Sequence, residues 1–523
     1  LSMLLALALC VGAQAAENTM LKVGLKYGSS ALFTARLQNY NDTLSGSGYT
    51  FGYYDADRSF VPLASTGEEK ITITVDSNAY VSGGVCYETK PASYSTVLGA
   101  YHIELLTTFN SYDEANAVAQ SYDKGFVAYV DGEYRVRVGN HASYDESARV
   151  LSETDVLTYG AQIVTPSSTG VVVSVTDTDM ILFEFDCSGL RSLGIEPRSV
   201  SGEKTVTWFA GYRYYGGFEY PRTTGGYLSV INVVDMEDYV KCVIAAEMSN
   251  DWPLEALKAQ TVCARTYAAA QTRHRSAGFD VCATVDCQAY RGASLSNERS
   301  DTAAEETRGV YLYYNGELVT NAVYYSCNGG ASESCKNVWG SDVPYLQGKL
   351  DPYEESVAWR FSRYYWSFTA TGDELRAILQ SEAKVDVGTV RNVYVSAYSD
   401  TGNVIALTFE GTKGSYTAQR EKCRTLLNGV YDHINVRSMR YTVTGGDAGT
   451  YYVNDAQSSV TGTGGLYILD SSGTAQMNGG TAKDTYVITA GGTTSLERES
   501  SNPNNTFTFS GSGWGHNVGM SQW

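Results

Sequence analysis

The sequence predicts a multidomain α+β protein. At 523 residues the chain exceeds the size at which one hydrophobic core stops growing, so roughly two to four domains are expected. Its 41 Tyr and 52 Gly against only 9 Pro favour β-structure, because aromatic residues suit pleated strands and glycines suit the turns between them. Helical periodicity is present as well, mainly between residues 236 and 276.

The charge balance argues against a nucleic-acid partner. The formal net charge is -19, whereas nucleic-acid binding is driven by Lys and Arg side chains that neutralise phosphates. The 10 Cys are too few for a disulfide scaffold of this length. Removal of Cys10 with a signal segment leaves an odd number, so at least one thiol is expected to be free or bound to a metal.

Residues 1–16 are predicted to be a secretory signal peptide. The apolar run from Met3 to Val11 is too short to span a bilayer, and Ala13-Gln14-Ala15 follows it with the small-x-small pattern of a cleavage site. A retained, uncleaved anchor is the alternative. In both cases the protein is expected to be secreted or membrane-anchored and to act outside the cytoplasmic membrane.

The next two regions differ in their pattern of apolar and polar residues. Residues 17–98 alternate apolar and polar positions in short runs, such as KITITVD, which predicts a β-rich N-terminal region. Residues 99–165 predict a strand–helix pattern that occurs twice. Ser111 opens the first helix with Glu114 in the capping-box position, and a second helix follows near Ser143. An Asp131-Gly132 turn separates two strands between them.

The predicted βαββαβ order and the segment YRVRVGNHASYDESARVL resemble a SPOR domain. This resemblance implies binding to peptidoglycan glycan strands that have lost their stem peptides. A generic βα repeat without a ligand is the alternative. The remaining chain, residues 166–523, predicts a mixed α+β domain, in which residues 446–505 form a Gly/Ser/Thr-rich insertion of β-hairpins or flexible chain.

One acidic side chain continues an apolar helix face. On a helix predicted over residues 236–248, Val240, Val243, Ile244 and Glu247 lie at i, i+3, i+4 and i+7. Burial beside this stripe and the negative end of the helix dipole both disfavour the ionised carboxylate, so the pKa of Glu247 is expected to be raised. A carboxylic acid that stays protonated near neutral pH can protonate a glycosidic oxygen. A solvated surface group is the alternative.

A second predicted helix starts at Trp252-Pro253, with Pro at the favoured first position. Lys258 and Arg265 share one face of it, so two cations could line the wall of a cleft. From spacing alone, an ordinary solvated helix face is the more common explanation for such a pair.

From about residue 195 onward the chain resembles the stage II sporulation protein D (SpoIID) and LytB family. The resemblance rests on DYVKCVIAAEM and WPLEALKAQTVCARTYA, in which Glu247 takes the position of the catalytic acid and Lys258 and Arg265 take those of basic residues needed for activity. It implies a peptidoglycan lytic transglycosylase that cleaves denuded glycan strands during sporulation and engulfment. Such an enzyme needs one carboxylate instead of the usual pair, because the C6 hydroxyl of muramic acid replaces water as the attacking group.

The resemblance leaves other functions open. The LytB branch implies a non-catalytic modifier that recruits or stimulates a cell-wall amidase, and a glycan-binding wall protein is a third reading. The expected partners are peptidoglycan glycan strands, with a cell-wall amidase or other sporulation wall proteins as further candidates.

A metal site is predicted in the segment after these helices. His274, Cys282 and Cys287 form an H-x7-C-x4-C arrangement, and thiolates with an imidazole suit tetrahedral Zn²⁺. A Cys282–Cys287 disulfide beside a surface His274 is the alternative. The family's similar DVCxTxxCQxY segment implies zinc, either structural or near the active site, and the fourth ligand stays open.

Two further segments predict substrate contacts. Both resemble motifs of the same family: YYSCNGGASESC around residues 324–335, in which Cys327 and Asn328 depart from the pattern, and the closing GWGHNVGMSQ, in which Asn517 replaces Gly. Glycines allow close backbone approach, and Trp offers a stacking face for a sugar. A Cys327–Cys335 disulfide is possible, and Ser326 lacks evident partners for a nucleophile. The predicted substrate-binding residues are Ser326, Gly329, Gly330, Ser332, Glu333, Trp514 and His516.

Overall fold

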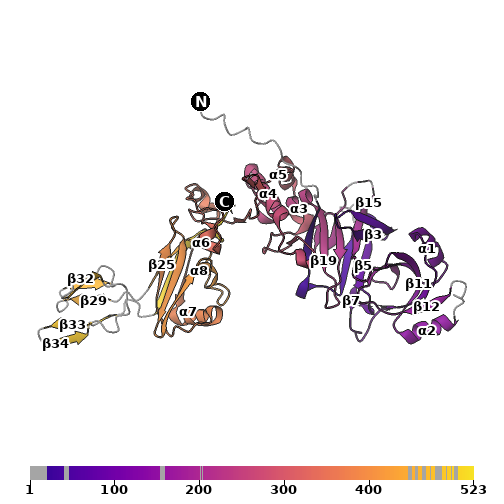
Figure 1. The fold of residues 1–523 in the computed structure, drawn as a ribbon, viewed down its shortest axis with the longest axis horizontal. Helices are drawn as coiled ribbons and strands as arrows, with labels where there is room; N and C mark the ends of the chain where they lie inside the picture. Colours follow the sequence, from indigo (N-terminus) through magenta and orange to yellow (C-terminus); the bar gives the residue numbers. More distant parts are fainter. Residues whose placement is uncertain are drawn as a thin grey trace, which may run out of the picture. The chain divides into compact units, whose positions relative to one another are not determined.

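The protein is a strand-rich α+β chain that forms two compact units, residues 1–321 (unit 1) and 322–523 (unit 2). The computed structural model describes residues 20–39, 46–153, 160–200, 202, 204–445 and 505–523, together with the backbone of short strands between residues 450 and 499 (Figure 1). The predicted signal peptide therefore lies outside the described residues. None of the helices in the described part of the chain combines the length and apolar character that a membrane span requires.

The described part of unit 1 contains two large sheets, a three-stranded sheet and a two-stranded sheet of β21 (Tyr313–Tyr314) and β22 (Glu317–Leu318). The first sheet has the strand order β20 (Val281–Cys282), β1 (Met20–Lys26), β19 (Val230–Asp235), β18 (Gly217–Tyr220), β15 (Leu193–Ser199), β3 (Gly46–Tyr54) and β4 (Phe60–Thr66). The second has the order β12 (Ala161–Val164), β9 (Tyr101–Leu105), β11 (Glu133–His141), β10 (Gly125–Val130), β14 (Ile181–Asp186), β13 (Val171–Val175), β5 (Lys70–Val75), β2 (Thr34–Gln38), β16 (Thr207–Phe209) and β17 (Tyr212–Tyr214). The third comprises β7 (Val85–Tyr87), β6 (Ala79–Ser82) and β8 (Thr96–Leu98).

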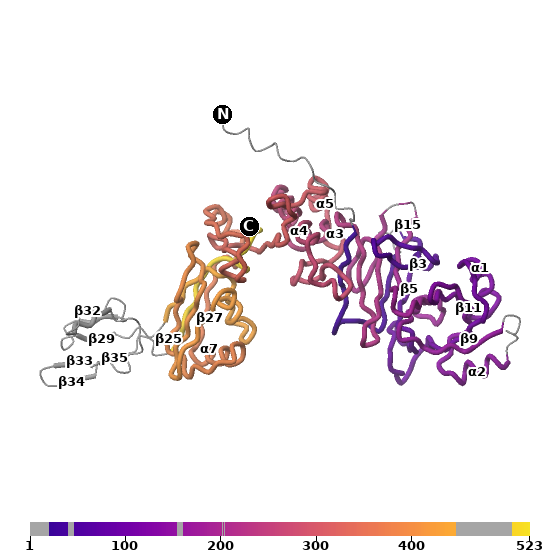
Figure 2. The backbone as a smooth tube through the Cα atoms, viewed as in Figure 1, coloured from indigo at the N-terminus to yellow at the C-terminus, as the bar shows by residue number. Residues whose placement is uncertain are grey.

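One hydrophobic core is shared by the two large sheets. Phe51 of β3 stacks on Phe183 of β14 with ring centroids 5.6 Å apart, and both side chains are buried. Strands far apart in the sequence meet in these sheets. β1 pairs antiparallel with β19, and the tube in Figure 2 shows this indigo strand beside magenta chain. The predicted boundaries at residues 98 and 165 therefore do not separate compact units, because strands from all three predicted regions pair within common sheets.

The βαββαβ order predicted for residues 99–165 is present as β9, α1 (Tyr112–Ala119), β10, β11, α2 (Tyr144–Glu153) and β12. Ser111 caps α1 by accepting a hydrogen bond from the Glu114 N–H, as predicted. Asp131 and Gly132 take positive φ values of 49° and 98° in the turn between β10 and β11. The strands do not end as a separate sheet, because β10 pairs on its other edge with β14.

Three helices follow β19: α3 (Met236–Glu247), α4 (Leu254–Ala270) and α5 (Glu298–Glu306). Asp235 caps α3 by accepting from the Glu237 N–H at 2.9 Å, and the predicted apolar stripe of α3 is buried. The predicted start of α4 needs a correction. Pro253 is its N-cap rather than its first residue, and no side chain caps this helix.

Unit 2 has its own core around two three-stranded sheets. One consists of β24 (Tyr365–Thr371), β36 (Thr506–Ser512) and β28 (Tyr441–Thr444), and the other of β25 (Val390–Tyr398), β26 (Val404–Gly411) and β27 (Gly414–Gln419). The helices α6 (Cys335–Trp339), α7 (Gly372–Ile378) and α8 (Lys422–Thr425) and the short strands β23 (Tyr324–Tyr325) and β37 (Met520–Ser521) complete it.

The predicted insertion contains short antiparallel hairpins. Its pairs are β29 (Thr450–Val453) with β30 (Ser458–Thr461), β31 (Tyr467–Asp470) with β32 (Gly473–Gln476), and β33 (Tyr486–Thr489) with β34 (Gly492–Ser495). Of the two alternatives left by composition, β-hairpins are therefore present.

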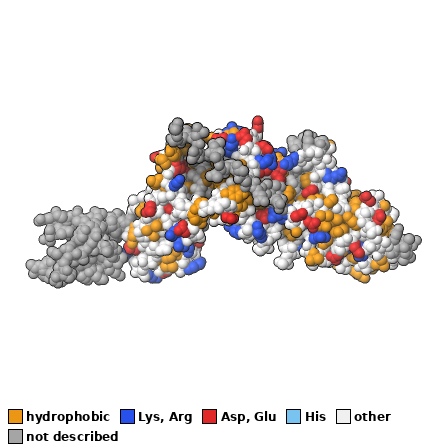
Figure 3. All heavy atoms as spheres, turned by 45° about the horizontal axis from the view of Figure 1, so that its top comes forward, with side chains coloured by type: hydrophobic (Ala, Val, Ile, Leu, Met, Phe, Trp, Pro, Cys, Tyr) orange, Lys and Arg blue, Asp and Glu red, His pale blue; other side chains and the backbone are white. Residues whose placement is uncertain are grey.

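On the face drawn in Figure 3, Lys and Arg side chains of the described residues lie interspersed with Asp and Glu and form no continuous basic surface.

The ten-stranded sheet buries a network of charged side chains, and its contribution to stability can be tested by mutation. The Arg137 guanidinium, 8% exposed, donates to Glu104 at 2.9 Å and to Glu184 at 2.5 Å. Arg137→Met should lower the free energy of unfolding by about 3 to 5 kcal/mol, because two carboxylates lose their buried partner. The matched change Arg149→Met removes an exposed pair with Glu153 and should cost less than about 0.5 kcal/mol. Urea denaturation measures both, and equal losses would contradict a structural role for the network.

Candidate functional site

The predicted site residues fall into two groups, one in each unit. Unit 1 holds Glu247, Lys258, Arg265 and the predicted metal ligands, and unit 2 holds the predicted substrate-binding residues. Each group is described within its own unit.

Glu247 is the last residue of α3 and is half-buried. Its Oε1 accepts a hydrogen bond of 2.7 Å from the Ala289 N–H. This contact joins the end of α3 to a residue 42 positions further along the chain. The carboxyl group is therefore held in a defined position although it is not enclosed by the core.

The segment that contacts Glu247, residues 274–290 (the anchored loop), is fastened to the core of unit 1. Gln288 accepts from the Tyr239 hydroxyl of α3 at 2.9 Å and donates to the Ala264 carbonyl of α4 at 3.3 Å. The Tyr290 hydroxyl donates to Asn232 of β19 at 2.7 Å. Because Gln288 and Tyr290 are buried on either side of Ala289, the amide offered to Glu247 has little freedom to move.

The anchored loop also gathers the predicted metal ligands. Ligand atoms of His274, Cys282, Asp286 and Cys287 all lie within 4.8 Å of one another. Cys282 and Cys287 are free thiols, so the alternative of a disulfide between them is not present. A hydrogen bond from Cys287 lowers the pKa of Cys282 and raises that of Cys287, so Cys282 is the first of the two thiols to ionise.

Asp286 is the candidate for the fourth ligand, which the sequence left open. Its Oδ2 lies 3.7 Å from the His274 Nε2, a buried nitrogen with no hydrogen-bond partner. Two thiol sulfurs, an imidazole nitrogen and a carboxylate match the donor types and the number that Zn²⁺ takes in tetrahedral sites. The residues present therefore fit this ion. The sequence signal for Asp286 was its place directly before Cys287.

Lys258 lies on α4 as predicted and is half-buried, but its ammonium group is paired with acids. It contacts Glu255 at 2.7 Å and Glu306 of α5 at 2.5 Å. These hydrogen bonds raise the pKa of Lys258, so the side chain is a cation throughout the neutral range. Glu306 is a partner that spacing along α4 could not show.

Arg265 does not line a cleft wall, and this expectation needs correction. Its side chain is 0% exposed, and its guanidinium donates to Glu237 of α3 at 2.6 and 3.0 Å. It also donates to the carbonyls of Ala304 and Val310 at 3.2 Å. Arg265 therefore joins α3, α4 and the end of α5 from inside the core, because packing of α5 encloses a helix face that periodicity alone showed as polar.

In unit 2 the predicted glycine segment is wrapped around a buried acid that the sequence analysis missed. Glu354, 2% exposed, accepts from the amides of Asn328 and Gly329, each at 2.7 Å, and from the Ser521 hydroxyl at 2.6 Å. A Cβ at Gly329 would lie 2.4 Å from the Ser512 carbonyl oxygen. Close approach at Gly329 is thus made by the chain itself rather than by a ligand.

Glu333 also differs from its predicted role in sugar binding. It is 2% exposed and accepts from Ser399, Thr401, the Ser334 amide and Asn337. Burial acts to raise its pKa, but these hydrogen bonds outweigh burial and lower the pKa. A buried, saturated carboxylate cannot reach a sugar on the surface, so Glu333 instead joins the turn after β25 to the start of α6.

The neighbouring predicted residues are more accessible. Ser332 is half-buried and accepts from the Lys349 amide at 2.9 Å, and the carbonyl of half-buried Ser326 accepts from the amides of Gln522 and Trp523 at 3.2 Å. Gly330 takes a φ of 117° that favours glycine. The possible Cys327–Cys335 disulfide is absent, since both residues are buried free thiols.

The closing motif lies against this segment. Trp514 exchanges backbone hydrogen bonds of 2.8 and 3.0 Å with Cys327, and the guanidinium of Arg437 lies 4.9 Å from the centre of its half-buried ring. Burial lowers the pKa of His516 to about 4, so this imidazole is neutral near pH 7. Asn517 takes a φ of 63°, which explains why Asn can stand at a position where the resembled motif has Gly.

Comparison with known proteins confirms the predicted family resemblance for part of unit 1. Residues 224–314 match the family model described as SpoIID, stage II sporulation protein. This segment contains Glu247, Lys258, Arg265 and the predicted metal ligands, and it ends before Ser326.

Three curated relatives are similar to the chain. The amidase enhancer of Bacillus subtilis is 32% identical over 302 residues, which cover 54% of this chain and 36% of the relative. Stage II sporulation protein D of the same organism is 29% identical over 138 residues, or 23% of this chain and 40% of the relative. An uncharacterized protein of Brachyspira hyodysenteriae is 40% identical over 141 residues, or 26% of this chain and 38% of the relative. The chain thus spans well under half the length of these relatives, and the resemblance of residues 99–165 to SPOR domains stays a prediction.

The burial of Arg265 generates a prediction about how it acts. Arg265→Met should lower the free energy of unfolding by about 3 to 5 kcal/mol, because Glu237 would keep a buried charge without its partner. Adding Glu237→Gln should recover part of the loss, since the unpaired charge is then removed. Arg308→Met, which removes an exposed pair with Glu305, is the matched control and should be nearly neutral. Normal stability of Arg265→Met in urea denaturation would show that the guanidinium is not a structural anchor.

Proposed function

We propose that the protein is a peptidoglycan lytic transglycosylase that acts at the cell wall, outside the cytoplasmic membrane, and cleaves denuded glycan strands in sporulation. The observation that carries this proposal is Glu247. It is the acid that the family resemblance marks, it ends α3 within the matched segment, and the anchored loop holds its carboxyl group through the Ala289 amide. The names of the relatives, stage II sporulation protein D and amidase enhancer, support a role at the wall.

The proposed reaction uses one carboxyl group twice. Protonated Glu247 gives its proton to the bridging glycosidic oxygen as the bond to the muramic acid C1 breaks. The resulting carboxylate then takes the proton of the C6 hydroxyl, whose oxygen forms the new bond to C1 and releases a 1,6-anhydro end. The glycosidic oxygen leaves as the hydroxyl of the departing strand, so atoms and protons balance without water.

The surroundings of Glu247 suit both steps. Its place in the last turn of α3 favours the protonated form through the helix dipole, and the Ala289 N–H stabilises the carboxylate once the proton has left. Arg265 contributes by positioning, since its guanidinium fastens α4 to α3 behind the site. Lys258, the one predicted cation with an accessible side chain, is proposed to orient sugars.

A second candidate function is enhancement of a cell-wall amidase without glycan cleavage. It is favoured by the length of the similarity to the amidase enhancer, which covers 54% of this chain. A wall amidase is the partner in this proposal, and the SPOR-like residues 99–165 would hold the glycan strand in either case.

We further propose that His274, Cys282, Asp286 and Cys287 hold a zinc ion. Bound zinc would supply a rigid cross-link within the anchored loop. The four residues close the first part of this loop, while Gln288 and Tyr290 fasten its end to α3, α4 and β19. The ligand residues would therefore act on Glu247 through the placement of Ala289.

The catalytic proposal predicts the outcome of Glu247→Gln. This variant should fold and bind glycan but lose at least about 100-fold in strand cleavage, because the amide cannot transfer a proton. Mass spectrometry of denuded strands measures 1,6-anhydro-muramic ends, with and without a purified amidase. Glu298→Gln is the control, since that acid is exposed at the start of α5. Full cleavage by Glu247→Gln would refute the proposal, and amidase stimulation that is unchanged in this variant would favour the enhancer.

The metal proposal predicts a bound ion in protein purified without added zinc. Elemental analysis should find about one zinc per chain, and Cys282→Ser or Cys287→Ser should abolish it because a thiolate ligand is lost. Cys86→Ser changes a half-buried thiol outside the cluster and should retain the ion. A quantitative Cys282–Cys287 disulfide in metal-free protein would contradict the proposal.

A further inference from the structure

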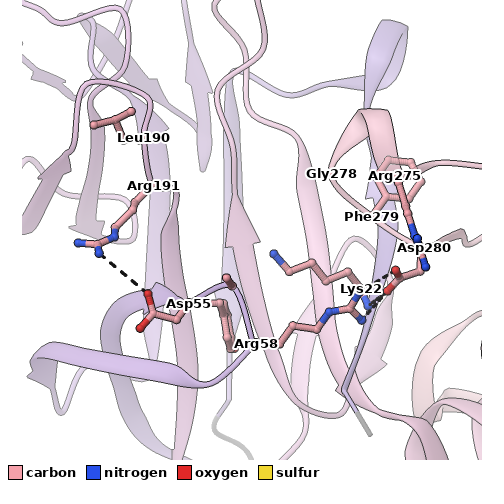
Figure 4. A pocket seen from close by; sticks show the side chains of 11 residues that line it. Lys22, Asp55, Arg58, Leu190, Arg191, Arg275, Gly278, Phe279 and Asp280 are labelled. Carbon is pink, nitrogen blue, oxygen red and sulfur yellow. Dashed lines mark hydrogen bonds and ion pairs between the residues drawn. The ribbon is translucent and has the colours of Figure 1, made fainter. Parts of the chain in front are cut away.

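A cavity of about 550 Å³ opens on unit 1 beside the anchored loop (Figure 4). Its volume lies within the range of about 300 to 1,000 Å³ that small-molecule sites occupy. Four cations and two acids are among the residues that line it, although the chain as a whole carries a net charge of -19. The charged lining residues are Lys22, Arg58, Arg191, Arg275, Asp55 and Asp280.

One side of the cavity is closed by a saturated ion pair. Both Asp280 oxygens accept from the Arg58 guanidinium, at 2.7 and 2.8 Å, and Oδ2 also accepts from the Lys22 amide at 2.8 Å. Arg58 reaches this position from a turn in which it takes a φ of 68°. Figure 4 shows this pair on one side of the cavity and the Arg191–Asp55 pair on the other. Asp280 is therefore neutralised within the fold and does not repel an anion.

The remaining cations are less well compensated. The Arg191 guanidinium lies 4.0 Å from Asp55, and both side chains are about half exposed, so water screens this contact strongly. Arg275 is exposed, and within the described ranges no residue forms an ion pair or hydrogen bond with its guanidinium. Lys22 is paired with Glu219, which is not among the lining residues. The surplus positive charge thus lies on Arg191 and Arg275.

We propose that this cavity binds a sugar that carries a carboxylate, with Arg275, on the side of the cavity opposite Arg191, as the group that meets the anion. Guanidinium groups bind planar carboxylates through paired hydrogen bonds, which sets them apart from a lysine ammonium. The identity of the sugar rests on the proposed function, because muramic acid is the component of wall glycan that carries a carboxylate. Removal of the stem peptide exposes this group.

The anchored loop connects this cavity to Glu247. Arg275, Phe279 and Asp280 of the loop line the cavity, and Ala289 of the same loop donates to Glu247. The ring of Phe279 is buried and stacks on the His274 ring with centroids 4.9 Å apart. A sugar held at Arg275 would therefore be held by the same segment that positions the proposed acid.

The test is calorimetric titration of the full chain with N-acetylmuramic acid, N-acetylglucosamine and inorganic phosphate. N-acetylmuramic acid should bind more tightly than the other two, because only this ligand combines the sugar ring with a carboxylate. Arg275→Gln should raise its Kd about five- to tenfold, the effect of losing one charge-assisted hydrogen bond. Arg308→Gln, an exposed arginine at the end of α5, is the matched control and should leave the Kd unchanged.

Three results would overturn the inference. They are equal affinity for N-acetylglucosamine, equal affinity for phosphate with the same dependence on Arg275, and an unchanged Kd in Arg275→Gln. The inference and the proposed function fail separately. Formation of 1,6-anhydro ends without binding of N-acetylmuramic acid would reject sugar binding in the cavity and support the proposed strand cleavage. Binding that depends on Arg275, without strand cleavage, would support sugar binding in the cavity and reject the proposed enzymatic function.

Discussion

The hydrogen bond from the Ala289 amide to Glu247 is the contact on which the site in unit 1 depends. A glutamate at the end of a helix can ordinarily adopt several rotamers. Here the partner is a backbone amide between two buried side chains, Gln288 and Tyr290, which are tied to α3, α4 and β19. The position of the carboxyl group is thus set by the core rather than by the side chain's own preferences, which is how a site gains the preorganisation that proton transfer requires.

Several polar residues that lie in the recognisable motifs or contact them serve the fold and do not face a ligand. Arg265, Glu333 and Glu354 are each at most 2% exposed, and each joins chain segments that are distant in sequence. A buried charge whose partner is removed costs far more than an exposed one, so such residues resist substitution as strongly as residues that touch a substrate. Motif residues of this kind mark the architecture around a site, and loss of activity on mutation does not by itself identify a group in contact with the reacting atoms.

Local features of the fold could be predicted from the sequence, whereas long-range contacts could not. The Ser111 cap, the Asp131-Gly132 turn and the end of α3 at Glu247 depend on residues within a few positions of one another. The pairing of β1 with β19 joins segments more than 200 residues apart, and the burial of Arg265 depends on α5, which periodicity along α4 cannot reveal. The residues of the proposed metal site were predictable in part, because His274, Cys282 and Cys287 lie in one short loop. Asp286 joins them only through the path that this loop takes.

The anchored loop brings three kinds of chemistry into one short segment. It carries the donor set of the proposed metal site, it lines a cation-rich cavity, and it supplies the amide that holds Glu247. A segment of 17 residues with little regular structure would ordinarily be mobile. Mobility would leave the metal-ligand atoms, the cavity lining and the Ala289 amide without fixed positions. Parallel pairing of β20 with β1 and the buried side chains at the loop's end remove part of that freedom, and the proposed metal cross-link would remove more. Because these restraints act on the same backbone, loss of the proposed metal cross-link would be expected to spread disorder to the amide of Ala289.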